Sequence, residues 1–586
     1  MAKEAMNVEY IEAARHSLSH ILAQAVCELF DGVQLGIGPA IDDGFYYDFD
    51  LKHRITEEDF AAIETKMTEI LKTDVAFVKR VVENPLEFFA NMPYKLELVK
   101  ELVEAGEKIT IYESGDFVDL CAGPHVENMR ELRNWGFKIS SIAGAYWRGS
   151  SDNAMLQRVY VHAFASRKEL KEYHAFLEEA KKRDHRMLGN QLDLFFFDET
   201  APGMAYWMPK GLKIYNKLLQ FSRDVHEAKG YQEVVGPQLN HSSLWVTSGH
   251  WQHYDGNMFK VQIDENNVYA IKPMNCPNAM IMFKKKNRSY RELPLRFSEL
   301  SMLHRDESSG AMHGLMRVQA FRQDDAHIFC TQEQIAGEMN GIMDIMDYIY
   351  NIFGLKYKAF LSTRPETFLG EIETWNEAEA VLKDVLASRF GEDGYTLNEG
   401  DGAFYGPKID IKVYDAIGRE WQLCTIQLDY QLASNFELEY TDSDGKRKTP
   451  VVVHRAVFGS VDRFIGVITE HFAARFPFWL SPVQIGIVPV HNQHEEYAKK
   501  IQDQLAQYGF RVSLDTSDGT MGNKIKGFRN ELVPYIIILG DKEVADGKIS
   551  LRVRTGVQVN DIELDKFIDA CLDMEDSYKI ELAEEF

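Results

Sequence analysis

The sequence predicts a protein of several domains that combines α+β and α/β regions. The chain of 586 residues is longer than the ~250 to 300 residues at which one hydrophobic core stops growing. Over residues 191–482, strand patterns rich in Val, Phe, Ile and Tyr are joined by Gly and Asn turns and interrupted by helical periodicity. This mixture favours a large antiparallel sheet flanked by helices. Over residues 483–578, short strands alternate with helices and predict a compact α/β domain.

The remaining boundaries follow from local patterns. Residues 1–165 mix helical stretches with short strands, and the turn-rich segment at 36–50 is typical of strand, turn and strand, so we predict an α+β domain. Apolar residues at helical spacing among charges predict an amphipathic linker helix over 166–190. Residues 579–586 form an acidic tail that we expect to be solvated.

Composition narrows the class of protein. No apolar run approaches the ~20 residues of a membrane span, and the first residues lack the pattern of a secretory signal, so we predict a cytoplasmic protein. The six cysteines stand singly, which argues against disulfides and leaves core thiols or metal ligands as alternatives. The net charge of −25 argues against a surface broadly adapted to nucleic acid, although three basic clusters allow one local basic face.

Three arginines are candidates for binding a phosphate-containing ligand. Arg305 and Arg317 flank a Gly- and Ser-rich loop between two predicted strands, and Arg463 lies at the start of a predicted helix. Arginines that face one site repel each other unless an anion lies between them, and a planar guanidinium matches a phosphate. Taken singly, each arginine is more often part of a surface ion pair. The sequence contains neither a P-loop signature nor an orderly GxGxxG, so a P-loop or Rossmann domain has no support.

The motifs around these arginines resemble those of class II aminoacyl-tRNA synthetases. HRDE, a loop, GLMRVQAF and then GSVDRF resemble motifs 2 and 3 in order and spacing, and GYQEVVGPQLN at 230–240 resembles motif 1, which in this class lies at a dimer interface. The resemblance implies that 191–482 is a catalytic domain with an antiparallel sheet, that the protein is a homodimer, and that Mg²⁺ accompanies ATP. The ATP-binding residues that it implies are Arg305, Glu307, Arg317, Phe321 and Arg463, of which Arg305 and Arg463 are also catalytic.

Cys276, His327 and His454 lie far apart, and their spacing alone predicts no metal site. Their surroundings, KPMNCP, DDAHIF and VHRAVFGS, resemble threonyl-tRNA synthetases, and the resemblance runs from about residue 8 to about residue 575. It implies that the three residues bind one catalytic Zn²⁺, whose open position takes the amino group and β-hydroxyl of L-threonine. The threonine-binding residues that it implies are Met274, Gln323, Asp325, Tyr405 and Gln422, with Asp325 receiving the amino group.

A site that must bind a hydroxyl rejects valine by ~10⁴, whereas serine keeps the hydroxyl and differs by a methyl group worth on the order of 1 to 3 kcal/mol. A second checkpoint is therefore expected. His16 and His20 stand four apart on a predicted helix, and DLCAGPH supplies Cys121 and His125; from the residues alone, a zinc site and structural histidines are both open. The resemblance to the editing domain of bacterial-type threonyl-tRNA synthetases implies metal-free hydrolysis of Ser-tRNA(Thr) by residues 1–165. The editing residues that it implies are His16, His20, Lys95, Asp119, Cys121 and His125.

The resemblance also implies contacts with tRNA(Thr). His250 in TSGHWQHY is expected near the terminal 2'-hydroxyl as a proton relay, with an inconsequential loop histidine as the alternative. GDKEV and ISLRVR resemble an anticodon-binding module over 483–578 and imply that Glu543 and Arg552 read anticodon bases. Ser517 and Asp518 depart from the Arg-Asn pair usual in the family. The chain also starts 15 residues before His16, where family members commonly carry a further small domain.

The predicted protein is thus a ligase that activates threonine with ATP, charges tRNA(Thr) and hydrolyses Ser-tRNA(Thr). A prolyl-tRNA synthetase shares the C-terminal module, but Cys276, His327 and His454 speak against it. An RNA-binding regulator without catalysis is disfavoured by the intact arginines and zinc candidates. A standalone editing hydrolase is disfavoured by the complete synthetase core.

Overall fold

The structure is a computed structural model that describes residues 8–264 and 267–586. The chain divides into two compact units, Met1–Glu178 and Glu179–Phe586. The division falls inside helix α5 (Arg167–Arg183), which is followed by α6 (His185–Gln191). The segment predicted as one linker helix therefore contains two helices. Asp184 has non-helical backbone angles, and its side chain accepts a hydrogen bond from the N–H of Arg186, which caps α6.

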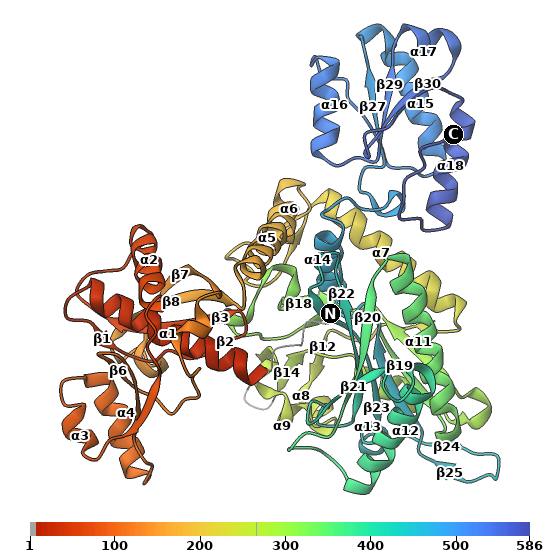
Figure 1. Cartoon of the computed structure of the whole chain (residues 1–586). Helices are drawn as coiled ribbons and strands as arrows, with labels where there is room; N and C mark the ends of the chain where they lie inside the picture. The colour runs from red at the N-terminus through yellow and green to blue at the C-terminus, as the bar shows by residue number, and fades with distance from the viewer. Residues whose placement is uncertain (1–7, 265–266) are drawn as a thin grey trace. The chain divides into compact units, whose positions relative to one another are not determined.

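The first unit is built on helix α1 (Val8–Leu29), which contacts the sheet through strands β2 and β3 (Figure 1). Ala14, Leu18, Ile21 and Leu22 recur at helical spacing on the face that is fully buried. The antiparallel sheet has the order β1 (Gln34–Leu35), β3 (Gly44–Asp50), β8 (Met155–Phe164), β7 (Gly136–Tyr146), with β2 (Ala40–Ile41) paired to β3; helix α2 (Phe60–Leu71) packs against α1 and β7.

A second, smaller sheet completes this unit and has its own apolar core, which includes Phe89, Val99 and Ile111. Its elements are β4 (Val78–Val81), β5 (Thr110–Ser114) and β6 (Phe117–Leu120), with helices α3 (Pro85–Phe88) and α4 (Pro93–Glu104). Because β6 ends directly before Cys121, this sheet carries the DLCAGPH segment.

An eight-stranded sheet forms the centre of the second unit (Figure 1). Its inner pairs are antiparallel, as predicted from the sequence, and the outer pairs β11/β16 and β20/β21 are parallel. The strand order is β11 (Gln232–Glu233), β16 (Leu295–Glu299), β19 (Asp325–Cys330), β26 (Val451–Ala456), β23 (Glu420–Asp429), β22 (Lys408–Tyr414), β20 (Lys356–Ser362), β21 (Tyr395–Asn398).

The two faces of this sheet differ in chemistry because side chains alternate along each strand. Ala326 and Ile328 of β19 join the main core, whereas Phe329 joins a separate core on the other face. The main core includes residues of helices α7 (Pro209–Ala228), α11 (Ile335–Ile352), α12 (Ile372–Phe390) and α14 (Val461–His471). The other core includes residues of helices α10 (Cys276–Lys284) and α13 (Leu432–Asn435), and it leaves room for polar side chains of β19, β26 and β23.

The C-terminal part is an α/β domain, as the alternation of strands and helices predicted. Its sheet has the order β28 (Val512–Leu514), β27 (Ile485–Pro489), β29 (Tyr535–Leu539), β30 (Ile549–Val553), β31 (Gln558–Ile562), and its helices are α15 (Glu495–Gln507), α16 (Met521–Asn530), α17 (Asp541–Asp546) and α18 (Leu564–Asp576). The expectation of a solvated tail at 579–586 is wrong. Leu582 and Phe586 pack against the core of this domain, and Tyr535 donates a hydrogen bond to the carbonyl of Ala583.

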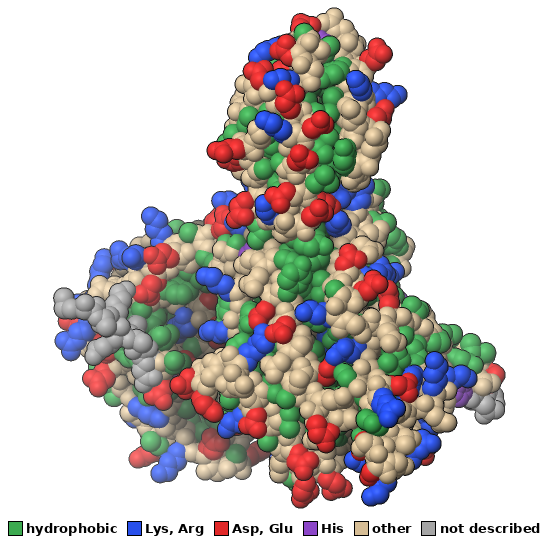
Figure 2. All heavy atoms as spheres, turned by 90° about the vertical axis from the view of Figure 1, so that its right-hand side faces the viewer, with side chains coloured by type: hydrophobic (Ala, Val, Ile, Leu, Met, Phe, Trp, Pro, Cys, Tyr) green, Lys and Arg blue, Asp and Glu red, His purple; other side chains and the backbone are tan. Residues whose placement is uncertain are grey.

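Short elements connect these layers: β9 (Phe195–Phe196), β10 (Tyr206–Trp207), β12 (Leu239–His241), α8 (Ser242–Thr247), α9 (His250–His253), β13 (Lys260–Gln262), β14 (Val268–Ile271), β15 (Arg288–Ser289), β17 (Met302–His304), β18 (Ala320–Arg322), β24 (Tyr440–Thr441) and β25 (Arg447–Lys448). Within the described residues, no helix has both the length and the apolar character needed to cross a membrane. On the face drawn in Figure 2, Lys and Arg side chains are interspersed with Asp and Glu, so the charge of −25 is not gathered there in one acidic field.

Candidate functional site

Cys276, His327 and His454, here called the three-donor cluster, converge on the polar face of the central sheet. Their ligand atoms all lie within 4.8 Å of one another, and all three side chains are buried. His327 and His454 are directly opposite in the pairing of β19 with β26, so both rings leave the same face. Cys276 begins α10, and the stacking of Phe283 on Phe329, with ring centroids 4.5 Å apart, holds this helix over that face.

The donor set fits a zinc ion. Nε2 of His454 lies 2.9 Å from a carboxylate oxygen of Asp429, which leaves Nδ1 of this ring as the nitrogen available to a metal. Nε2 of His327 is buried without a hydrogen-bond partner, an arrangement that is costly unless a cation or a water satisfies it. Burial lowers the pKa of His327 well below its ordinary value and favours the neutral ring that metals bind.

The predicted threonine-binding residues fall into two groups. Asp325 lies on the same face as His327 and accepts a hydrogen bond from Asn275 at 3.1 Å, and burial raises its pKa. The Tyr405 ring is centred 5.5 Å from that of His454, and Met274 Sδ lies 3.2 Å from Nε2 of His250. These residues surround the three-donor cluster. The other two, Gln323 and Gln422, line the adjoining cavity.

His250, the predicted proton relay, is fully buried beside this pocket. Its Nδ1 lies 2.8 Å from the hydroxyl of Ser248. Burial, followed by the proximity of His454, lowers the pKa of His250 to about 4, so the ring is neutral at physiological pH.

A cationic cavity of about 280 Å³ adjoins the pocket. Its lining includes all the predicted ATP-binding residues: Arg305, Glu307, Arg317, Phe321 and Arg463. Burial and then the nearby charge of Arg317 lower the pKa of Arg463, and Nε of Arg463 has no hydrogen-bond partner. The Arg305 guanidinium carbon lies 5.1 Å from the centre of the Phe321 ring. A cavity with several unneutralised guanidinium groups is suited to a phosphate-containing anion.

The loop that precedes Arg463 is held by Asp324, which the sequence analysis missed. This buried carboxylate accepts hydrogen bonds from the backbone N–H groups of Val457 and Gly459 at 3.0 and 3.1 Å. Burial raises the pKa of Asp324 to about 7. The side chain is separated by more than 130 residues from the groups it holds, and only strand pairing brings them together.

His185 was also missed, and it connects the loop carrying Arg317 to helix α14. Its Nε2 accepts the N–H of Leu315 at 2.9 Å, so Nδ1 carries the proton and donates it to Glu470 of α14 at 2.6 Å. Gly314 has a φ of +50°, and a Cβ there would lie 2.3 Å from Nε2 of His185. Both ring nitrogens are used, so the neighbouring group of Asp184, His185 and Glu470 offers no free imidazole to a metal.

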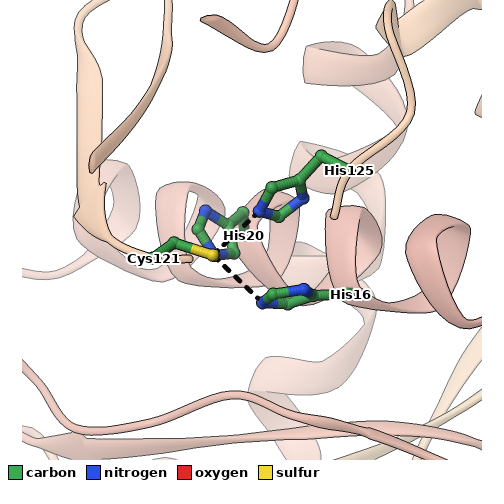
Figure 3. Close-up of side chains that lie close together, drawn as sticks. All are labelled: His16, His20, Cys121 and His125. Carbon is green, nitrogen blue, oxygen red and sulfur yellow. Dashed lines mark hydrogen bonds between the residues drawn. The ribbon is translucent and has the colours of Figure 1, made fainter. Parts of the chain in front are cut away.

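The predicted editing residues meet in the first unit, where Figure 3 shows His16, His20, Cys121 and His125. A cavity of about 850 Å³ is lined by five of them, namely His16, His20, Lys95, Asp119 and Cys121. Lys95 Nζ lies 2.7 Å from Asp119, which also accepts a hydrogen bond from Tyr47. His125 is not among the residues that line the cavity, and its Nε2 lies 3.1 Å from the Cys121 sulfur. Tyr47 had no sequence signal, because it is 72 residues away from Asp119 and its strand contains a second tyrosine, Tyr46.

The anticodon candidates lie in the C-terminal domain. Glu543 accepts hydrogen bonds from the N–H of Gly540 at 2.9 Å and from the hydroxyl of Ser550 at 2.7 Å, so its carboxylate already holds the start of α17. Arg552 lies two residues beyond Ser550 on β30, and its Nε is buried without a partner. Ser517 donates a hydrogen bond to Asp515, and Asp518 is exposed.

Comparisons with known proteins place these features in a family. The model of the "tRNA synthetase class II core domain (G, H, P, S and T)" matches residues 259–472. The "Anticodon binding domain" matches 484–574, and the "Threonyl and Alanyl tRNA synthetase second additional domain" matches 109–160.

Individual relatives and solved structures indicate the same family as these models. The chain is 47% identical over 577 residues to a threonine–tRNA ligase of Thermotoga petrophila, with 97% of this chain and 89% of the relative covered. It is 48% identical over 561 residues to that of Caldanaerobacter subterraneus subsp. tengcongensis, with 95% and 86% covered. The RNA binding domain of threonyl-tRNA synthetase from Cryptosporidium parvum Iowa II has a TM-score of 0.65 at 43% identity, covering 69% of this chain and 100% of that chain. Prolyl-tRNA synthetase from Giardia lamblia, with a TM-score of 0.52 at 16% identity and coverage of 69% and 80%, shows a shared fold alone.

The antiparallel sheet, the arginine-lined cavity beside it and the matching core model define a class II aminoacyl-tRNA synthetase. This result confirms the predicted fold class. Within that class, identity over nearly the whole length shows that the chain belongs to the threonine–tRNA ligase family. The predicted family is thereby confirmed, whereas the roles of individual residues and the predicted domain boundaries stay predictions.

We expect His185→Ala to weaken ATP binding because the Arg317 loop loses its attachment to α14. Removing the imidazole leaves the Leu315 N–H without a partner, at a cost of about 1 to 3 kcal/mol, and takes one hydrogen bond from Glu470, which keeps its ion pair with Arg419. Roughly a tenfold rise in KM for ATP, with a smaller change in kcat, should appear in pyrophosphate exchange. Lys182→Ala, which removes an exposed side chain from α5, is the matched control. An unchanged KM for ATP would count against the positioning role.

Proposed function

We propose that this chain activates L-threonine with ATP, transfers it to the 3' end of tRNA(Thr), and hydrolyses Ser-tRNA(Thr) at a second site. The observation that carries the proposal is the convergence of Cys276, His327 and His454 beside a cavity lined by arginines. The cavity offers the charge that ATP requires, and the cluster offers soft and nitrogen donors where the amino acid would lie.

We infer that the three-donor cluster binds one Zn²⁺. Three protein donors leave one coordination position open, which is typical of catalytic zinc. When bound, zinc would act as a Lewis acid toward the amino group and hydroxyl of threonine on the side that the three protein donors leave open. Asp429 orients His454, and Asn275 orients the carboxylate of Asp325, which then receives the substrate ammonium. Mg²⁺ is expected to accompany ATP, bound mainly by its phosphates.

The chain's own residues then have to bring two anions together. The threonine carboxylate attacks the α-phosphorus of ATP, and diphosphate leaves, so negative charge accumulates on the phosphoryl group. Arg305 and Arg463 are positioned to neutralise this charge, and Arg317 to hold the outer phosphates. Because Asp324 fixes the loop before Arg463, that guanidinium is held in place before ATP arrives.

The proposed specificity follows from which group the pocket binds. Valine lacks the hydroxyl and leaves the site's polar groups unpaired, so discrimination of ~10⁴ is expected. Serine keeps the hydroxyl and escapes this test, because one methyl group provides only about 1 to 3 kcal/mol. The first unit is proposed to remove the resulting Ser-tRNA(Thr).

In the editing cavity, hydrolysis requires an oriented water and a group that takes its proton. His16 is the side chain we assign to that task, because it lines the cavity and burial lowers its pKa, so that the ring is neutral. The Lys95–Asp119 ion pair is buried in the cavity wall and is suited to the terminal ribose and phosphate of the tRNA.

Other assignments rest on the family resemblance. We propose that His250 relays the proton of the terminal 2'-hydroxyl, that Glu543 and Arg552 contact the anticodon, and that the chain is a cytoplasmic homodimer. A proline-specific enzyme is disfavoured, because identity to the prolyl structure is 16% against 47% to a threonine–tRNA ligase. A regulator without catalysis is disfavoured by the complete set of arginines around the cavity.

Cys276→Ser is expected to remove the bound zinc and to lower threonine-dependent pyrophosphate exchange by at least a hundredfold. The reason is that the softest of three donors is lost and the substrate hydroxyl has no position to occupy. Zinc per chain and exchange should be measured together. The control is Cys330→Ala, which removes a thiol from the opposite face of β19. Exchange that persists after the zinc is gone contradicts the assigned role.

Arg463→Ala is expected to slow adenylate formation by about 10² to 10³, the usual effect of removing one donor to a developing charge. Arg463→Lys should recover part of the rate, because it restores the charge without the planar fork. Rapid-quench measurement of threonyl-adenylate separates this step from transfer. Arg389→Ala, whose guanidinium pairs with Asp344 and Asp347, serves as the control. A rate unaffected by loss of Arg463 is incompatible with the proposal.

His16→Ala is expected to charge threonine normally but to accumulate Ser-tRNA(Thr), with deacylation slowed by about 10² to 10⁴ because a general base is missing. The measurement is hydrolysis of purified Ser-tRNA(Thr), with threonylation followed in parallel. His53→Ala, an exposed histidine of the same unit that pairs with Asp59, is the control. Equal clearance of Ser-tRNA(Thr) by the two variants would refute the assignment.

A further inference from the structure

His16, His20, Cys121 and His125, here called the four-donor cluster, form a compact set of nitrogen and sulfur atoms (Figure 3). One ligand atom from each lies within 4.8 Å of every other. His16 and His20 come from one face of α1, and the other two come from the segment after β6. His20 and Cys121 are buried, and the cavity of about 850 Å³ gives access to the cluster.

The tautomers of two of the rings are fixed by their surroundings. Nδ1 of His16 lies 3.2 Å from the carbonyl of Pro124, and a carbonyl can only accept, so Nδ1 carries the proton. Nδ1 of His125 lies 3.0 Å from the hydroxyl of Ser17, whose only proton is donated to the carbonyl of Ala13. Nδ1 of His125 is therefore also a donor. In both neutral rings, Nε2 presents its lone pair.

Both lone pairs are directed at one sulfur. Nε2 of His16 is 3.4 Å and Nε2 of His125 is 3.1 Å from the Cys121 sulfur. A thiol has one proton and can satisfy only one of them. The N–H of Gly123 also points at the sulfur, at 3.2 Å, and stabilises negative charge there. The cluster thus has more electron-pair donors than protons to share among them.

A tetrahedral zinc site has matching dimensions. With Zn–S near 2.3 Å and Zn–N near 2.0 Å, tetrahedral geometry separates sulfur from nitrogen by about 3.5 Å. The two measured separations, 3.4 and 3.1 Å, are close to that value. The contacts of Nδ1 with Pro124 and Ser17 are the second contacts that metal-binding histidines usually make.

We propose that the four-donor cluster is a binding site for a thiophilic divalent cation of the zinc class, and that occupancy switches the hydrolytic site off. On binding, the Cys121 thiol proton is released, sulfur becomes the anionic ligand, and three neutral imidazoles complete the shell. Four protein ligands close a tetrahedral shell, so no position remains to activate water. The Nε2 lone pair of His16 is engaged and cannot accept a proton from the attacking water.

The inhibitory half of this inference rests on the proposed editing function, whereas the binding half does not. Two nearby cations, Lys95 and Lys79, oppose metal entry. The ammonium of Lys95 is paired with Asp119 at 2.7 Å, and that of Lys79 donates a hydrogen bond to the carbonyl of Ala122 at 2.7 Å. The two metal sites of the chain would therefore differ in kind. Three donors at the synthetic site leave room for the substrate, and four donors at the editing site exclude it.

The test compares the full-length chain with its Cys121→Ser variant. Zinc is counted after equilibration with excess Zn²⁺ and removal of free metal, and hydrolysis of Ser-tRNA(Thr) and threonylation are measured during the titration. We expect the wild type to hold one equivalent more than the variant, and hydrolysis to fall at least tenfold as that equivalent binds and to recover with a chelator. Threonylation should not fall while the extra equivalent binds. Cys27→Ser, which removes the exposed thiol of α1, should behave as the wild type.

Two further measurements make the result independent of activity. Co²⁺ added to the chain that holds zinc at the three-donor cluster alone should give a cobalt–thiolate charge-transfer band that Cys121→Ser lacks. Ser17→Ala should weaken metal binding about 10- to 100-fold by freeing His125. Equal zinc content in the wild type and Cys121→Ser overturns the metal site. Hydrolysis that is unchanged or faster with the extra equivalent bound overturns the inhibition. If the metal-free chain does not hydrolyse Ser-tRNA(Thr), the editing function and the inhibition fail together, while the zinc count still decides the binding site.

Discussion

The register between β19 and β26 is the constraint on which the synthetic site depends. His327 and His454 are separated by more than 120 residues, and they share a face only because they are direct partners in this ladder. Since side chains alternate along a strand, a slip of one residue would turn one imidazole into the apolar core. The same slip would expose Ile328 or Val453, both of which are fully buried. The apolar core on one face thereby fixes the donor geometry on the other.

This constraint extends to the anion site. Arg463 follows directly from β26 through a loop held by Asp324, and Asp324 immediately precedes β19. The two histidines of the three-donor cluster and the guanidinium group of Arg463 are thus positioned by one strand pair. His185 adds a second attachment, from α6 to the loop that carries Arg317 and to the helix that carries Arg463. The guanidinium groups of this site therefore lie close together and repel one another, and a bound anion relieves that repulsion.

Much of this arrangement could be predicted from the sequence. Some features follow from local patterns, and others only from the resemblance to a family. The antiparallel class of the central sheet and the C-terminal alternation follow from periodicity, which is local. The three-donor cluster had no local signature, and only the motifs around Arg305 and Arg463 made it recognisable. The residues that were missed, among them Asp324, Asp429 and His185, act through backbone or ring contacts with distant partners. Nothing in a segment's own pattern shows such a contact. The prediction that 579–586 is solvated was wrong because it relied on the acidic residues and neglected Leu582 and Phe586, which pack on the core.

The two histidine-containing clusters differ in the number of their donor atoms more than in the type of donor. This difference fits the proposed synthesis at one cluster and the proposed hydrolysis at the other. Both combine cysteine with imidazole, and in both burial lowers the pKa of ring nitrogens. At the central sheet the cluster itself contains two imidazoles, with Asp325 and Tyr405 beside it, so space next to the donors is available to the proposed substrate. Around Cys121 the extra histidine fills that space with another lone pair. In the proposed reaction, the ester is then attacked by a water that the metal-free imidazoles orient. The Lys95–Asp119 pair holds a positive charge near these imidazoles while the rings themselves stay neutral. Removing Lys95 would leave the buried Asp119 carboxylate without its cation and would draw another cation toward the bases, so the ion pair favours the metal-free cavity in which hydrolysis is proposed.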